Sequence, residues 1–161
     1  MAGEQHELWS KIAPRDDRER LSGGVGISMT EADLNELRAA LRRSWSVETS
    51  PLWLPENPAR GQCNVTALVF WDHFGGDILK TRVEEEWHFY NRVAGTAYDL
   101  SAEQFSVLPT YLDIPSSRDE ALAGTAPERY QALAARVREV LATAVPRPSA
   151  SPVLRLPLTG D

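Results

Sequence analysis

The single cysteine of the chain, Cys63, is the residue best suited to covalent chemistry. It follows Gly61 and Gln62 and precedes an apolar segment that is predicted to be helical, so its thiol lies at a helix N-terminus. The unpaired backbone N–H groups and the dipole of such an end favour a thiolate, and they can bind the oxyanion formed when it attacks a carbonyl group. Cys63 is therefore a candidate nucleophile. The alternative is a small buried side chain whose thiol is inert.

A nucleophilic thiol also needs a base and a group that orients the base. Among the three histidines, His6 lies in the polar N-terminal segment. His73 follows Cys63 on the same predicted helix, where the rise per residue separates the two by about 15 Å. His88 lies in a predicted strand after the helix and remains as the candidate base.

A hairpin turn at 94–95 would pair the strand that carries His88 with the segment that carries Asp99. In that register Ser101 lies opposite His88, and Asp99 is a diagonal neighbour on the same face. Diagonal neighbours are about 7–8 Å apart at the backbone, within reach of histidine and aspartate side chains. The sequence thus allows a Cys63–His88–Asp99 triad. In it Cys63 attacks a carbonyl and forms a thioester, while His88 moves the proton and Asp99 holds the imidazole.

Four further residues are candidates for binding the oxyanion or the substrate. Gln62 could donate to the oxyanion, or it could only cap the helix. Asn91 points to the opposite face of a regular strand from His88, and its alternative is a buried amide bonded to backbone. Trp45 and Tyr90 could line an acyl pocket, although aromatic residues at such positions are more often part of the core. The other tryptophans that could line it are Trp53, Trp71 and Trp87.

Local patterns predict the elements of the first half of the chain. "TEADLNELRAALRRSW" begins with Thr30 and Asp33 in a capping pattern and repeats leucines on one face, which predicts an amphipathic helix. Three prolines within 51–58 exclude a regular element there and predict a loop on the surface. The segment from Cys63 to about Phe74 is apolar nearly all round, so we expect a buried helix.

The second half is predicted to hold antiparallel strands followed by a helix. The strands are "DILKTRV", "EEEWHFYNRV" and the start of "GTAYDLSAEQF". A final amphipathic helix is expected to have Thr125 as its cap, Pro127 in its first turn and Glu128 closing the capping box. The predicted fold class is α+β, in which the nucleophile-bearing buried helix packs on a small antiparallel sheet.

The length of the chain, 161 residues, and its composition favour a single globular domain. We expect the domain to span 29–145, between a flexible N-terminal arm (1–28) and a proline-rich disordered tail (146–161). A formal charge of −6 with scattered arginines argues against a nucleic-acid partner. The sequence has no signal-peptide pattern and no apolar run of about 18 residues, so no membrane partner and a cytoplasmic location are expected. One cysteine and dispersed histidines predict no metal site, and no cofactor is indicated.

The chain resembles the YunG-like family of small bacterial proteins over about residues 35 to 112. The resemblance is carried by a set of short motifs along this stretch. They are Trp45-Ser46, Thr49-Ser50, the proline-rich loop, Gly61-Gln62-Cys63, Val65-Thr66-Ala67, Gly75-Gly76, His88, Asn91-Arg92, Gly95, Asp99-Leu100 and Gln104-Phe105. Ser101 stands where threonine is commoner in the family.

This resemblance implies a relative of the papain-like and transglutaminase-like cysteine enzymes, which carry the cysteine on a helix and the histidine and aspartate on strands. The expected function is a cysteine-dependent acyl transfer on a small-molecule or peptidyl substrate, as an amide or thioester hydrolase, an acyltransferase or a cyclase. Such an enzyme would suit a specialised bacterial biosynthetic pathway. The alternatives are a non-catalytic small-molecule or peptide-binding module on the same scaffold, and an immunity or structural protein with an inert thiol. The sequence does not indicate an oligomeric state.

Overall fold

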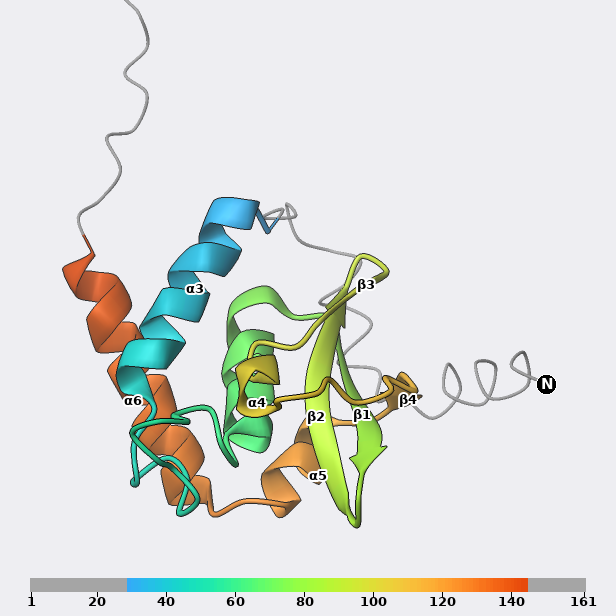
Figure 1. The fold of residues 1–161 in the computed structure, drawn as a ribbon. Helices are drawn as coiled ribbons and strands as arrows, with labels where there is room; N and C mark the ends of the chain where they lie inside the picture. The colour runs from blue at the N-terminus through green and yellow to red at the C-terminus, as the bar shows by residue number, and fades with distance from the viewer. Residues whose placement is uncertain (1–28, 145–161) are drawn as a thin grey trace, which may run out of the picture.

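The computed structural model describes residues 29–144. Within them, helices cover one side of a small antiparallel sheet whose strand order is β3-β2-β1-β4 (Figure 1). The helices are α3 (Glu31–Ser44), α4 (Cys63–Phe74), η1 (Ala102–Gln104), α5 (Arg118–Ala123) and α6 (Pro127–Thr143). The strands are β1 (Asp77–Val83), β2 (Glu86–Val93), β3 (Thr96–Tyr98) and β4 (Ile114–Pro115). This arrangement confirms the α+β class. The expected arm and tail, 1–28 and 146–161, lie outside the described residues.

Helix α3 forms as its local pattern predicts. The Thr30 side chain accepts from the backbone N–H of Asp33, and the Asp33 side chain accepts from the backbone N–H of Thr30. The leucine face of α3 is buried against α6. No helix between residues 29 and 144 has the length and apolar character needed to cross a membrane.

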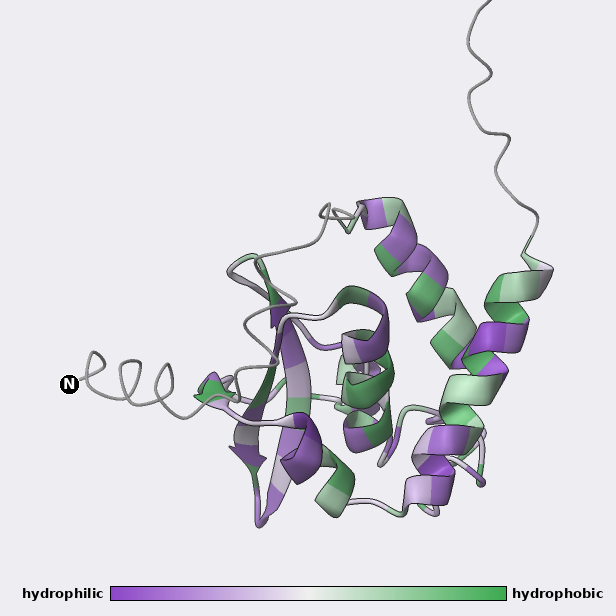
Figure 2. Ribbon diagram, turned by 180° about the vertical axis from the view of Figure 1, so that it is seen from behind, coloured by the Kyte–Doolittle hydropathy of each residue, from purple (hydrophilic) through white to green (hydrophobic). Residues whose placement is uncertain are grey.

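Helix α4 lies between the α3–α6 pair and the sheet, which explains its apolar character on all sides. Val69 and Phe70 pack in the cluster shared with α3 and α6, whereas Leu68 packs in the cluster that contains Ile78 and Phe89 of the sheet. Figure 2 shows α4 mostly in hydrophobic colours between the more polar outer helices and the sheet. The prediction of a buried central helix is therefore confirmed.

The β2–β3 hairpin has the register that the sequence predicts, with Val93 paired to Thr96. Ala94 and Gly95 both have positive φ, 50° and 81°, which is the signature of a type I′ turn. Pairing stops at Tyr98, so the expected pairing of Ser101 opposite His88 does not form, and Asp99 leaves the sheet beside β2.

Two features of the C-terminal part differ from expectation. The prediction that Thr125 caps the last helix is wrong, because Ala126 is the N-cap and provides no side-chain bond. The N–H of Thr125 instead bonds to the carbonyl of Leu122 and closes the turn after α5. Helix α5 and strand β4 were not predicted, although Ser117 caps α5 by accepting from the N–H of Glu120, a pattern that is visible in the sequence.

Candidate active site

Cys63 is the first residue of α4, and a tight loop immediately precedes it. Gly61 has φ +70°, and a Cβ at this position would lie 2.4 Å from the Ser50 hydroxyl oxygen, so a side chain is excluded on both counts. Gln62 is the N-cap but makes no side-chain cap bond, and the first helical bond joins the N–H of Thr66 to its carbonyl. The backbone N–H of Cys63 therefore has no partner within the helix. Cys63 is 9% exposed, and its thiol donates to Asn64 Oδ1 at 3.3 Å.

His88 and Asp99 form a short, buried contact. His88 Nε2 donates to Asp99 Oδ2 at 2.6 Å, and the two side chains are 2% and 8% exposed. The other ring nitrogen, His88 Nδ1, is buried and has no hydrogen-bond partner among residues 29–144. The ring of Phe105 packs edge-on against the imidazole, with centroids 4.8 Å apart. His88 is thus fixed through one nitrogen and free to exchange a proton through the other.

The surroundings of His88 favour its charged form. Burial lowers its pKa, but the hydrogen bond to Asp99, the interaction with Cys63 and the charges of both groups outweigh burial and raise the pKa to about 9. Because Cys63 contributes to the raised pKa of His88, its thiol lies close to the imidazole ring. The Sγ and Nδ1 atoms do not, however, meet the geometric criteria for a hydrogen bond. An imidazolium at neutral pH would stabilise a neighbouring thiolate.

Asp99 receives hydrogen bonds at both carboxylate oxygens. Oδ2 accepts from His88 and from the hydroxyl of Tyr111 at 2.8 Å, while Oδ1 accepts from the backbone N–H and the hydroxyl of Ser101, each at 3.2 Å. Burial and the bond to Asp99 raise the pKa of the Tyr111 hydroxyl well above its ordinary value, so it stays a donor. Tyr111 was not predicted, because it lies in an irregular segment without a periodic pattern.

The segment that carries Tyr111 is attached to the sheet by two hydroxyl groups. Thr81 on β1 donates to the carbonyl of Thr110 at 2.6 Å. Tyr90 on β2 accepts from the N–H of Asp113 and donates to its carboxylate, both at 2.8 Å. The Tyr90 and Tyr111 rings also pack edge to face. Tyr90 therefore anchors this segment.

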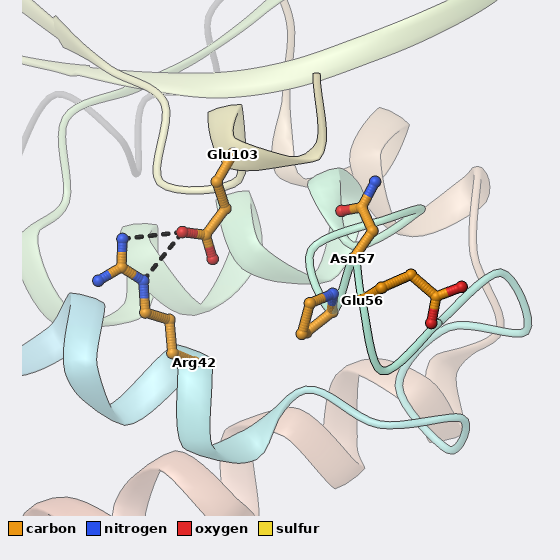
Figure 3. Close-up of a pocket in the computed structure, with 5 residues that line it drawn as sticks. Arg42, Glu56, Asn57 and Glu103 are labelled. Atoms are coloured by element: carbon orange, nitrogen blue, oxygen red, sulfur yellow. Dashed lines mark hydrogen bonds and ion pairs between the residues drawn. The ribbon is translucent and has the colours of Figure 1, made fainter. Parts of the chain in front are cut away.

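The other side of Asp99 is held through η1, which follows it in the chain. Arg42 of α3 pairs with Glu103 (Figure 3), and the side-chain amide of Asn57 donates to the carbonyl of Gln104 at 3.0 Å. A hollow of about 330 Å³ lies beside these contacts. It is lined by Arg42, Glu56, Asn57, Pro58 and Glu103. No nucleophilic side chain lines it, so we regard these contacts as support for η1 and hence for Asp99.

Cys63 and His88 both line a cavity of about 490 Å³. The lining residues come from the loop before α4, the first turn of α4, the β1–β2 hairpin, the end of η1 and the start of α6. Its volume lies within the range of about 300–1,000 Å³ that is usual for small-molecule sites. Trp87 and Phe105 contribute apolar surface to it. Among residues 29–144, no three His, Cys, Asp or Glu side chains are close enough together to hold a metal ion.

The four candidate binding residues do not line this cavity. Trp45 is buried in the core and donates from Nε1 to Thr66, and Tyr90 anchors the 110–113 segment. Asn91 donates to the carbonyl of Ala67 on α4, which is the backbone role considered as its alternative. Gln62 is fully buried: Nε2 lies 3.5 Å from the carbonyl of Ser46, and Oε1 has no partner among residues 29–144. Trp53 and Trp71 are also absent from the lining.

Comparisons with known proteins give one consistent relationship. The chain is 51% identical over 100 residues to "Uncharacterized protein YunG" of Bacillus subtilis (strain 168), a match that covers 62% of this chain and 87% of that protein. No solved structure matches the chain. The family model described as "YunG protein" matches residues 33–142, a span that includes Cys63, His88, Asp99 and Tyr111. The chain therefore belongs to the YunG family.

Proposed function

We propose that this protein is a cysteine-dependent acyl-transfer enzyme with Cys63 as nucleophile, His88 as acid and base, and Asp99 as the group that orients His88. One observation carries the proposal: His88 is bonded through Nε2 to Asp99, its buried Nδ1 has no partner among residues 29–144, and its ring interacts with Cys63 at the wall of a shared cavity. The structural alternative for a strand histidine, a satisfied residue of the core, leaves this free nitrogen unexplained.

The reaction would proceed through a thioester. Transfer of the Cys63 proton to His88 Nδ1 gives the thiolate–imidazolium pair that the raised pKa of His88 favours in the resting enzyme. The thiolate sulfur then forms a bond to the substrate carbonyl carbon, whose oxygen becomes an oxyanion. The backbone N–H of Cys63 is placed to donate to that oxyanion. The bond to the leaving group then breaks, and the leaving group takes the proton from His88. Water or another nucleophile, deprotonated by His88, attacks the thioester and restores the thiol.

The choice of acyl acceptor decides whether the enzyme hydrolyses, transfers or cyclises its substrate. The cavity volume suits a small-molecule or short peptidyl acyl group. A helix-borne cysteine followed by a histidine and an aspartate on and beside antiparallel strands supports a papain-like or transglutaminase-like core as part of this proposal.

The first test is the pH dependence of iodoacetamide labelling of Cys63, followed by mass spectrometry. We expect fast labelling at about pH 6–7, because an imidazolium beside the thiol favours the thiolate. His88→Ala should slow labelling strongly. His73→Ala is the matched control, because its ring is bonded to the backbone carbonyl of Val69 on α4 and does not line the cavity.

Labelling only above about pH 8.5, the ordinary range of a free thiol, would contradict the proposal. The same holds for labelling only after denaturation. In either case the cavity would be better explained as the site of a non-catalytic binding module. Equal slowing by His88→Ala and His73→Ala would show that the effect reflects folding rather than a proton exchanged with Cys63.

A further inference from the structure

The cavity at Cys63 carries opposite charges on two of its walls. Glu84 and Glu86, from the β1–β2 hairpin, form what we call the acidic wall. Arg60, from the loop before α4, and Arg129, from the first turn of α6, form the basic wall. Figure 1 shows the β1–β2 hairpin and the start of α6 on opposite sides of the start of α4. The nucleophile thus lies between the two walls.

These four charges are not used by the fold. None of them has an ion-pair or side-chain hydrogen-bond partner within the described part of the chain, residues 29–144. Neighbouring charges behave differently: Arg82 pairs with Glu85 beside the acidic wall, and Lys80 pairs with Glu120. Opposite charges that remain unpaired on two walls of one cavity are available to a ligand.

A second observation identifies this cavity as a built site. His88, 2% exposed, is a lining residue whose Nδ1 has no hydrogen-bond partner among residues 29–144. A buried polar atom without a partner is costly unless a reacting group or ligand meets it. The charged walls therefore lie in the same cavity as His88, whose Nδ1 is available to a reacting group.

We propose that the substrate is a small zwitterionic amide, such as a short peptide, with its ammonium group at the acidic wall and its carboxylate at the basic wall. This inference rests on the proposed function and assigns its substrate class. Arg60 and Arg129 can each bind a carboxylate through two parallel N–H donors. A singly charged substrate would leave one wall without a partner, and a polyanion would be repelled by Glu84 and Glu86.

The test uses four chloroacetyl reagents with the same reactive group and different charges. They are Nα-chloroacetyl-lysine (zwitterionic), its methyl ester (cationic), Nα-chloroacetyl-norleucine (anionic) and the methyl ester of the latter (neutral). Each alkylates Cys63 by forming an S–C bond with loss of chloride. At low ionic strength we expect the zwitterion to react fastest, by about fivefold for each wall it engages relative to the neutral reagent. High salt should reduce this preference because it screens the charges.

Substitutions assign the preference to each wall. Arg60→Gln with Arg129→Gln should remove the advantage of the carboxylate-bearing reagents, and Glu84→Gln with Glu86→Gln should remove that of the ammonium-bearing reagents. The rate of each charged reagent is divided by the rate of the neutral reagent on the same variant, so that a change in the reactivity of the thiol itself cancels. Arg138→Gln and Glu139→Gln are the matched controls, because these exposed residues of α6 do not line the cavity.

The outcomes separate this inference from the proposed function. If all four reagents react equally fast and the rates depend on His88, the substrate class is wrong and the enzyme proposal stands. If the anionic or the cationic reagent reacts faster than the zwitterion, a singly charged substrate replaces the zwitterionic one. If no reagent modifies Cys63 faster than it modifies an ordinary free thiol, the proposed function itself fails.

Discussion

At the scale of single residues, Asp99 decides how His88 is held. Its Oδ2 accepts from both His88 and Tyr111, so the two donors share the negative charge of one oxygen. Tyr111 does not line the cavity, and we therefore treat it as a positioning residue. Its hydroxyl limits the negative charge that is available to stabilise the imidazolium.

Replacing Tyr111→Phe is expected to raise the pKa of His88, because Asp99 loses a competing donor and its charge acts on the imidazolium alone. The loss of one buried hydrogen bond should lower the free energy of unfolding by about 1 kcal/mol. An NMR titration of the His88 ring protons measures the first effect, and urea unfolding measures the second. Tyr98→Phe is the control, because the Tyr98 ring stacks on Phe70 and its hydroxyl is not among the donors to Asp99. An unchanged or lower His88 pKa in Tyr111→Phe would refute the positioning role.

The sequence predicted the contact between His88 and Asp99 because a two-residue turn sets the register of the hairpin. It did not predict Tyr111, since that residue reaches Asp99 through tertiary bonds made by Thr81 and Tyr90. Asn91 donates to the carbonyl of Ala67, as the alternative of a buried amide bonded to backbone predicted.

At the scale of elements, the start of α4 depends on the conformation of Gly61. Gly61→Ala should lower the free energy of unfolding by about 2 kcal/mol or more, because it adds both a side chain at φ +70° and a clash with Ser50. It should also slow the labelling of Cys63, since the clash displaces the residue that leads into the helix. Gly95→Ala is the matched control, because it has φ +81° with nothing within 4 Å of the added Cβ.

Thermal unfolding and iodoacetamide labelling of the two variants check this prediction. We expect Gly95→Ala to cost about 1 kcal/mol and to leave labelling unchanged. Equal stability losses in the two variants, or fast labelling of Cys63 in Gly61→Ala, would show that the loop tolerates a side chain and does not position the thiol.

Helices α3 and α4 were predicted from local signals, α5 was missed despite its Ser117 cap, and β4, which is formed by tertiary contacts, was not predicted. The capping box at Thr30 correctly predicted α3, and the apolar run from Cys63 to Phe74 correctly predicted α4. Strand β4 consists of two residues that pair with β1, so no sequence period could reveal it. The prediction that Thr125 caps α6 was wrong, because the same sequence pattern also fits a residue that closes the preceding turn.

At the scale of the whole molecule, the site joins three parts of the fold. Cys63 belongs to the central helix, His88 to the sheet, and Asp99 to the segment that η1 and α3 hold in place. The His88–Asp99 contact therefore links the chemistry of the site to global stability. The raised pKa of His88 makes that link dependent on pH.

Wild-type stability should fall as the pH rises from about 6.5 to about 9. The folded protein holds the His88 proton up to a pKa of about 9, against 6.5 for an ordinary histidine, so the stabilisation is complete below about pH 6.5 and is lost as the pH passes about 9. Asp99→Asn should lower the free energy of unfolding by about 2–3 kcal/mol at pH 7 and flatten the curve above it. Urea unfolding at several pH values measures both effects, and Glu139→Gln is the control. Parallel curves for wild type and Asp99→Asn would mean that Asp99 does not hold the His88 proton.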